Sequence, residues 1–143
     1  MIKNKLSWRP HVDKIAAKAT RSLNFVRRNL RTSSPNVKET AYNSLVRPSL
    51  EYASSVWDPH LAYQRNKIEM VQRRAARFVI GRYHNTSSVT NMLETLGWET
   101  LSTRRTKSRL TMTYKIMHNL VDIPITPYFS PHPSIVNTTN MRL

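Results

Sequence analysis

Apolar residues between positions 10 and 31 recur every three or four residues, the spacing of one face of an α-helix. Plotted at about 100° per residue, they form one narrow stripe: Val12, Ile15, Ala16, Ala19, Leu23, Val26 and Leu30. Pro10 suits the first turn of such a helix, because the backbone N–H that it lacks would have no partner there. The pattern predicts an amphipathic helix from Pro10 to about Arg31.

A second helix is expected after Ser34 and Pro35, which are placed to cap and to begin it. From Ala41 to Trp57 its only charged residues are Arg47 and Glu51, and its apolar residues, Leu45 among them, point in every direction. Such a helix is usually buried, so we expect it at the centre of the core, with a kink at Pro48. The aromatic residues interpreted as core are Tyr42, Tyr52, Trp57 and Trp98.

Three more helices are expected further along the chain. The third runs from about His60 to Ile80, with Gly81 as its C-terminal cap and a buried face of Leu61, Ile68, Val71, Ala75, Phe78 and Val79. A short fourth helix is capped by Ser87 or Ser88 and closed by Gly97. The fifth, about Thr100 to Val121, has a basic first half of Arg104, Arg105, Lys107 and Arg109 and an apolar face of Leu110, Tyr114, Met117 and Val121.

No segment alternates apolar and polar residues as a half-buried strand does. The sequence therefore predicts an all-α, bundle-like domain of about five helices over residues 1–122. Residues 123–143 are expected to form an extended or disordered tail, because they contain Pro124, Pro127, Pro131 and Pro133.

Basic residues outnumber acidic ones by 23 to 8, which gives a formal net charge of +15. A charge this large repels itself, which favours a negatively charged partner. On the first and third predicted helices, basic residues lie away from the apolar stripe, and we interpret them as phosphate contacts: Lys14, Lys18, Arg21, Arg28, Arg73, Arg74 and Arg77. The alternative is that they form an ordinary solvated helix face.

Phe25 lies among the basic residues of the first helix. One interpretation is an aromatic platform that stacks on a base, and the other is packing beneath a neighbouring helix.

Several other kinds of site lack the residues that they need. The chain has no cysteine, and its five histidines show no metal-ligand spacing, so we expect no metal site. Two glycines are too few for a glycine-rich phosphate loop, and we expect no cofactor. No apolar run of about 18 residues is present, so we expect no membrane partner.

Several runs of residues follow one another in a specific order over about Leu6 to Pro131. They include Phe25-Val26-Arg27-Arg28-Asn29-Leu30, Leu45-Val46-Arg47-Pro48-Ser49-Leu50-Glu51-Tyr52, Val56-Trp57-Asp58-Pro59, Val71-Gln72-Arg73-Arg74-Ala75-Ala76-Arg77-Phe78 and Leu96-Gly97-Trp98. In this order they resemble the region that follows the palm in non-LTR (LINE-type) reverse transcriptases, and they are most similar to the jockey-type branch. The resemblance implies a helical thumb region that holds template and primer while the palm polymerises.

The palm of these enzymes holds two magnesium ions on carboxylates that include an adjacent Asp-Asp pair. The aspartates of this chain are isolated: Asp13, Asp58 and Asp122. The resemblance therefore implies a nucleic-acid-binding fragment that lacks the polymerase site and is not itself an enzyme. Its implied partners are RNA or an RNA–DNA hybrid, contacted through phosphates, and the missing palm, in the nucleus or the cytoplasm of a cell.

Three alternatives stay open. A generic basic chromatin-type or ribosomal protein would explain the charge but not the residue order. A decayed copy of a mobile element would keep the residue order without any activity. A helix bundle whose basic face meets anionic membranes would use the same charge in a different setting.

Overall fold

A computed structural model describes residues 7–83 and 88–124 of the chain. Its helices are α1 (Arg9–Asn29), α2 (Pro35–Ala41), the π-helical turn η1 (Tyr42–Val46), α3 (Arg47–Glu51), α4 (Ala62–Ile80), α5 (Val89–Thr95) and α6 (Leu101–Met117). Since α2, η1 and α3 follow one another without a break, these residues form five helical segments, and the described ranges contain no strand. The prediction of an all-α fold of about five helices is confirmed.

The chain divides into two units, the first ending at Arg109 and the second beginning at Leu110. The predicted boundary between a domain of residues 1–122 and a tail stays a prediction, because residues 125–143 lie outside the described part of the chain.

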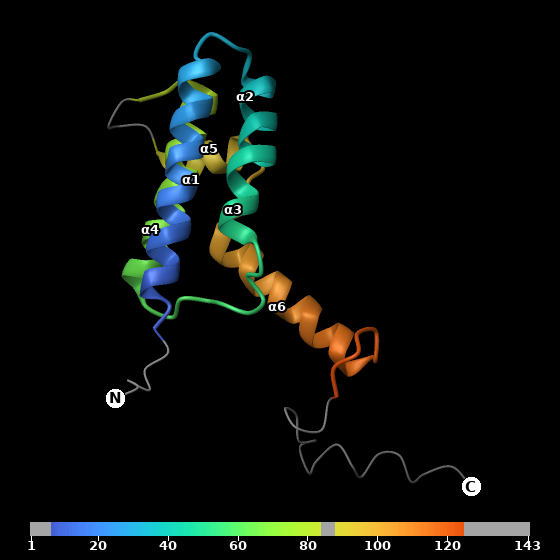
Figure 1. The fold of residues 1–143 in the computed structure, drawn as a ribbon. Coiled ribbons are helices and arrows are strands. Elements are labelled where there is room, and N and C mark those ends of the chain that lie inside the picture. Colours follow the sequence, from blue (N-terminus) through green and yellow to red (C-terminus); the bar gives the residue numbers. More distant parts are fainter. Residues whose placement is uncertain (1–6, 84–87, 125–143) are drawn as a thin grey trace, which may run out of the picture. The chain divides into compact units, whose positions relative to one another are not determined.

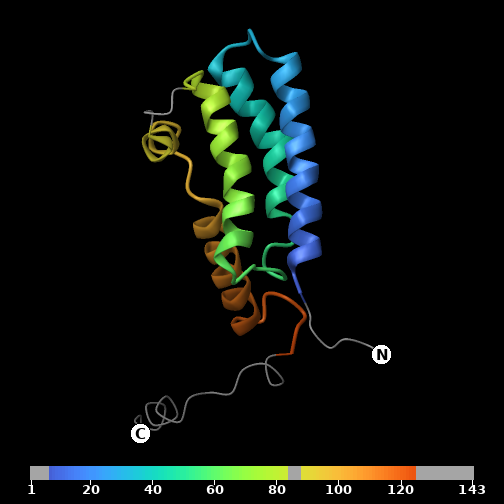
Figure 2. The same ribbon diagram turned by 90° about the vertical axis from the view of Figure 1, so that its left-hand side faces the viewer.

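In the first unit, α1, α4 and the run α2–η1–α3 lie side by side (Figures 1 and 2). The predicted stripe of α1 faces the other two: Val12, Ala16, Ala19, Leu23 and Val26 are buried, and Ile15 and Leu30 are partly buried. From the facing helices, the core receives Tyr42, Val46, Leu50, Ile68, Val71, Ala75 and Phe78. Because each large apolar side chain contributes about 1.5–3 kcal/mol when fully buried, this three-sided core is the main source of the unit's stability.

The predicted second helix is wrong in its extent. It ends at Glu51 and not at Trp57, and the residues after it form turns. Leu45, Tyr52 and Val56, which were expected in the core, are 52%, 82% and 73% exposed. The physical reason is that Tyr52 and Val56 lie in the turns after the helix, where no helix covers them. Leu45 lies on a different side of the helix from its buried residues, Tyr42, Val46 and Leu50.

Pro48 coincides with a local change of helix type, and the kink expected there stays a prediction. It lies just after η1, in which the Arg47 N–H reaches back five residues to the Tyr42 carbonyl. Proline lacks an N–H and crowds the carbonyl four residues before it. A wider π-helical turn at that point accommodates the ring and lets the helix continue into α3.

Several predicted ends and caps are confirmed. The α2 helix begins at Pro35 after Ser34, although the Ser34 side chain makes no capping hydrogen bond. Gly81 ends α4 in the left-handed conformation with φ of 75°. Ser88 caps α5, where its Oγ accepts a hydrogen bond from the Asn91 N–H.

The predicted buried face of α4 is confirmed for Ile68, Val71, Ala75, Phe78 and Val79 and is wrong for Leu61, which precedes α4 as its N-cap and is 43% exposed. In the second unit, Leu110, Tyr114 and Met117 of α6 are between 58% and 65% exposed, so their alignment makes an apolar face without making a core.

Candidate nucleic-acid interface

The acidic side chains are concentrated around the first half of α6. Five of the eight acidic residues form ion pairs, and four of those five neutralise cations of α6. The pairs are Glu51 with Arg104, Asp58 with Arg105 and Arg109, Glu69 with Arg105, and Glu99 with Lys107. The basic half of α6 is therefore neutralised within the protein and is not a free cationic surface.

Glu69 of α4 has a second role at the start of α6. Its carboxylate accepts hydrogen bonds from the backbone N–H groups of Leu101 at 3.3 Å and Ser102 at 2.7 Å. A carboxylate at a helix N-terminus pairs N–H groups that the helix itself leaves free and is favoured by the helix dipole. This contact fixes the start of α6 against α4 through the same carboxylate that pairs with Arg105.

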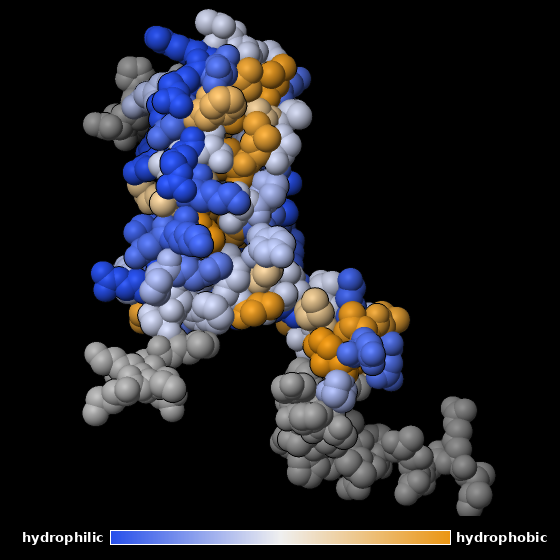
Figure 3. Space-filling model, viewed as in Figure 1, coloured by the Kyte–Doolittle hydropathy of each residue, from blue (hydrophilic) through white to orange (hydrophobic). Residues whose placement is uncertain are grey.

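The basic residues predicted as phosphate contacts are in a different position. Within residues 7–83 and 88–124, no ion pair involves any of them: Lys14, Lys18, Arg21, Arg28, Arg73, Arg74 and Arg77. In the view of Figure 3, hydrophilic side chains gather over α1 and the side of α4, and apolar ones lie along the boundary between α1 and α2. The uncompensated charge is thus on the α1–α4 side.

Arg21 and Arg74 line a groove between α1 and α4, which we call the α1–α4 groove. Its volume is about 460 Å³, and its other lining residues are Asp13, Ala16, Ala17, Thr20, Lys67, Met70 and Val71. The one acid in this lining, Asp13, is paired with Lys67 at 2.6 Å. Arg21 and Arg74 therefore bring two unneutralised guanidinium groups, from different helices, to one concave surface.

Arg73 lies on another side of α4 from Arg74. It lines a separate depression between α4, α5 and the start of α6, together with Arg65. Adjacent residues on a helix point about 100° apart, and here Arg73 and Arg74 line different depressions. Arg77 is partly buried and lines neither depression. The three arginines are therefore not a single cluster.

Lys14, Lys18 and Phe25 lie on the outer face of α1 and line neither depression. Phe25 is 55% exposed, so the interpretation that it packs beneath a neighbouring helix is wrong. It is an exposed ring on a cationic helix face.

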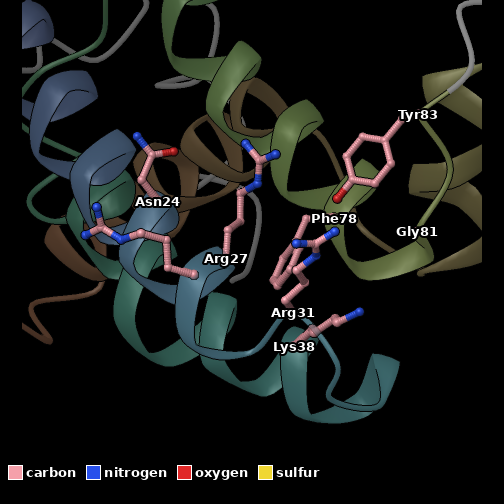
Figure 4. A pocket seen from close by; sticks show the side chains of 8 residues that line it. Asn24, Arg27, Arg31, Lys38, Phe78, Gly81 and Tyr83 are labelled. Atoms are coloured by element: carbon pink, nitrogen blue, oxygen red, sulfur yellow. The ribbon is translucent and has the colours of Figure 1, made fainter.

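A larger cavity follows the groove along α1 and lies where α1, α2 and the end of α4 meet. We call it the arginine pocket; its volume is about 880 Å³, and it is lined by Asn24, Arg27, Arg28, Arg31, Lys38, Phe78, Gly81 and Tyr83 (Figure 4). Of these, the sequence interpretation had singled out only Arg28 as a contact. The spacing of Arg27 and Arg31, one helical turn apart, was a usable signal. Lys38 and Tyr83 join them only through tertiary packing.

Two aromatic residues of the arginine pocket have different environments. Phe78 is 3% exposed, and the Lys38 Nζ lies 5.1 Å from the centre of its ring, a cation–π contact. Tyr83 is 55% exposed. Figure 4 shows its hydroxyl directed toward the side chains of Arg31 and Phe78. Phe78 is therefore a wall of the pocket, and Tyr83 an accessible ring at its edge.

The pKa shifts belong to the ion-paired interior and not to these surfaces. The hydrogen bond from Arg104 to Glu51 raises the pKa of the Arg104 guanidinium. Burial, with a further contribution from Glu51, raises the pKa of the Tyr42 phenol above its usual range. Both groups hold their ordinary protonation states more firmly than they would in water.

The described residues include no cluster of three or more His, Asp or Glu side chains that would hold a metal ion. Nor does any helix among them have the length and apolar character to cross a bilayer. No protein-family model, curated protein or solved structure matches the chain.

Proposed function

We propose that this chain is a nucleic-acid-binding helical domain that holds the phosphate backbone of RNA or an RNA–DNA hybrid in the α1–α4 groove. In this proposal it is the thumb-like part of a non-LTR retrotransposon reverse transcriptase, acts with a palm located elsewhere, and works in the nucleus or the cytoplasm. The family assignment rests on the order of residues alone. The binding function rests on one observation, the separation of paired from unpaired charge.

That separation has a simple energetic meaning. The cations of α6 are neutralised by Glu51, Asp58, Glu69 and Glu99, so they have little to gain from an external anion. Arg21 and Arg74 have no such partner within the described ranges. A polyanion that enters the α1–α4 groove replaces mutual repulsion by attraction and releases its own counterions.

The length of the cationic surface fits a nucleic-acid strand. From Arg21 to Arg28, α1 rises about 10 Å. One strand carries a charge about every 3.4 Å of its axis, so about three phosphates fall along this stretch. Phosphate contacts give affinity without base identity, which suits a domain that holds any template.

A membrane surface is the weaker candidate. Helices that bind membranes place an apolar stripe in the lipid. The stripe of α1 is used in the core, where Val12, Leu23 and Val26 are at most 1% exposed. Phe25 alone is a small apolar contribution on that face.

The test is a fluorescence-anisotropy titration of an RNA–DNA hybrid over a series of salt concentrations. The parent protein should lose affinity linearly with log salt, with a slope of about −0.9 for each neutralised phosphate. Arg74→Glu should weaken binding on the order of tenfold. It should also make the slope of log affinity against log salt shallower by about 0.9, the contribution of one phosphate contact. Arg21→Glu, on the other wall of the groove, should act in the same way.

Arg73→Glu is the matched control, because it makes the same change in net charge at the adjacent residue on another side of α4. It should weaken binding much less than Arg74→Glu does. Equal losses for the two variants would mean that net charge alone attracts the ligand and would refute the groove. An affinity that salt does not change would refute phosphate binding altogether.

A further inference from the structure

We infer that the arginine pocket holds one unpaired nucleotide, with its base stacked on Tyr83 and its phosphate among Arg27, Arg31 and Lys38. This inference rests on the proposed function and names a substrate class for it: a hybrid or duplex that continues into a single strand. The single strand would leave the α1–α4 groove and enter the pocket.

The charge of the pocket selects an anion. Four cations face one cavity: Arg27 and Arg28 of α1, Arg31 in the turn after α1, and Lys38 of α2. The described residues that line it include no carboxylate. None of the four forms an ion pair within the described part of the chain. Guanidinium groups present several N–H donors in a plane, a geometry that matches two oxygens of one phosphate.

The aromatic ring selects a base. Tyr83 is accessible at the edge of the pocket, and any base can stack on a tyrosine ring because every base has a π-face. Phe78 is not available for this contact, since it is buried and Lys38 lies over its ring. The pocket therefore offers one stacking surface for a base beside several hydrogen-bond donors for a phosphate, and a nucleotide contains both groups.

The end of α4 places this ring. Gly81 has a φ of 75°, a left-handed conformation that L side chains rarely adopt, and its N–H closes the helix on the Arg77 carbonyl. The chain turns there, and two residues later Tyr83 lies against the pocket. A β-carbon at Gly81 would meet nothing within 4 Å, so the glycine is required for its backbone conformation and not for space.

The stacking requirement excludes a base in the interior of a duplex. A cavity of about 880 Å³ is large enough for a nucleotide-sized ligand. A base between two neighbouring pairs is stacked on both faces and cannot present one to a side chain unless it leaves the stack. A single-stranded extension offers such bases without the cost of unpairing them.

The position along α1 connects the pocket to the groove. The groove is lined by α1 residues from Asp13 to Arg21, and the pocket by residues from Asn24 to Arg31. On α4 the order is the same, with Lys67 to Arg74 in the groove and Phe78 in the pocket. A backbone that follows the groove reaches the pocket without changing direction.

The experiment compares three ligands by anisotropy: a blunt RNA–DNA hybrid, the same hybrid with a short single-stranded RNA extension, and the same extension without bases. The extended hybrid should bind on the order of tenfold more tightly than the blunt one, the size expected for stacking of one base. The extension without bases should lose most of that advantage and keep only the part due to phosphates.

Tyr83→Ala should remove most of the advantage of the extension and leave the part due to phosphates, and Arg31→Gln should reduce that remaining part. Tyr52→Ala is the matched control, because Tyr52 is 82% exposed and does not line the pocket. If the blunt hybrid binds but the extension adds nothing, or its advantage survives Tyr83→Ala, the inference is overturned while the proposed function stands. If none of the three ligands binds, the proposed function itself fails.

Free adenosine monophosphate offers the same base and phosphate without a strand. It should compete poorly with the extended hybrid, because it gains nothing from the groove. Loss of the extension's advantage at adenosine monophosphate concentrations similar to that of the hybrid would show that the pocket serves a free nucleotide, and would overturn the inference.

Discussion

Arg105 of α6 donates a hydrogen bond from its Nε to Asp58 Oδ1 at 3.2 Å, and its guanidinium is 1% exposed. Its Nη2 lies 4.0 Å from Glu69 of α4. One buried cation therefore links α6 both to the segment after α3 and to α4. From the sequence, Arg105 belonged to the basic half of the fifth helix, like any surface arginine.

Arg105→Ala should destabilise the fold by about 3 kcal/mol, because it leaves Asp58 and Glu69 near each other without the cation between them. Arg109→Ala removes a partner of the same aspartate, at 2.7 Å, but Arg109 is 46% exposed, so the expected loss is at most about 1 kcal/mol. Urea unfolding followed by circular dichroism measures both. Equal midpoints for the two variants would show that burial of Arg105 does not matter.

Trp57→Ala should cost about 3–5 kcal/mol, since the side chain is 3% exposed and leaves a large cavity when it is removed. Its indole also donates to the Tyr52 carbonyl at 2.8 Å. Tyr52→Ala keeps that carbonyl and removes an exposed ring, so it should change stability by less than about 0.5 kcal/mol. Thermal melts of the two variants check the contrast, and a melt of Trp57→Ala that matches the parent would contradict it.

The two aromatic residues just compared show what the sequence could and could not predict. The helices α1 and α4 are long and have a regular apolar stripe. Their observed ends lie within about two residues of the predicted ends. The segment from Ala41 to Trp57 has no stripe, so its pattern could not show which apolar residues face the core. Only packing against α1 and α4 decides that Trp57 is buried and Tyr52 exposed.

Tyr42→Phe should change the free energy of unfolding little at neutral pH. Above about pH 10 the stability of this variant should fall less with pH than that of the parent protein. The Tyr42 hydroxyl is buried and has no hydrogen-bond partner among the described residues, so its removal costs no bond. Burial raises the pKa of Tyr42 in the folded state, so the folded protein keeps this proton after the unfolded chain has released it at about pH 10. Stability from this group is thus complete below about pH 10 and falls as the pH rises further.

Urea unfolding at several pH values above 10 measures this effect. With each pH unit, the free energy of unfolding of the parent should fall by up to about 1.4 kcal/mol more than that of Tyr42→Phe. Parallel curves for the two proteins would show that Tyr42 ionises as easily in the folded state as in the unfolded chain.

Primer extension on a primed RNA template with magnesium and nucleotides should yield no product above a control without protein. Asp13 is paired with Lys67, and Asp58 with two arginines, so neither is placed beside a second free carboxylate to share a metal ion. Magnesium-dependent extension by a pure preparation would contradict the assignment to a region outside the palm.

The sequence could predict that the candidate site consists of basic residues, but not which of these residues lie together. Helix periodicity alone placed Arg21 and Arg74 away from the core, and the structure brings them into one groove. The same periodicity grouped Arg73 with Arg74, because it separates a buried face from an exposed one but not one exposed side from another. The arginine pocket needs Lys38 and Tyr83, whose positions depend on how α2 and the end of α4 pack against α1.

On the proposed function, the division of charge described above assigns folding and binding to different residues. Loss of Glu69, Asp58 or Arg105 would destabilise the fold, whereas loss of Arg21 or Arg74 would leave it folded and weaken binding. Natural selection for a working domain would preserve both sets, and selection for folding alone would preserve only the ion-paired set. A lineage free of both constraints would lose the two sets at the same rate. Counting inherited changes at these two sets of positions would therefore tell a working domain from a decayed copy without any binding measurement.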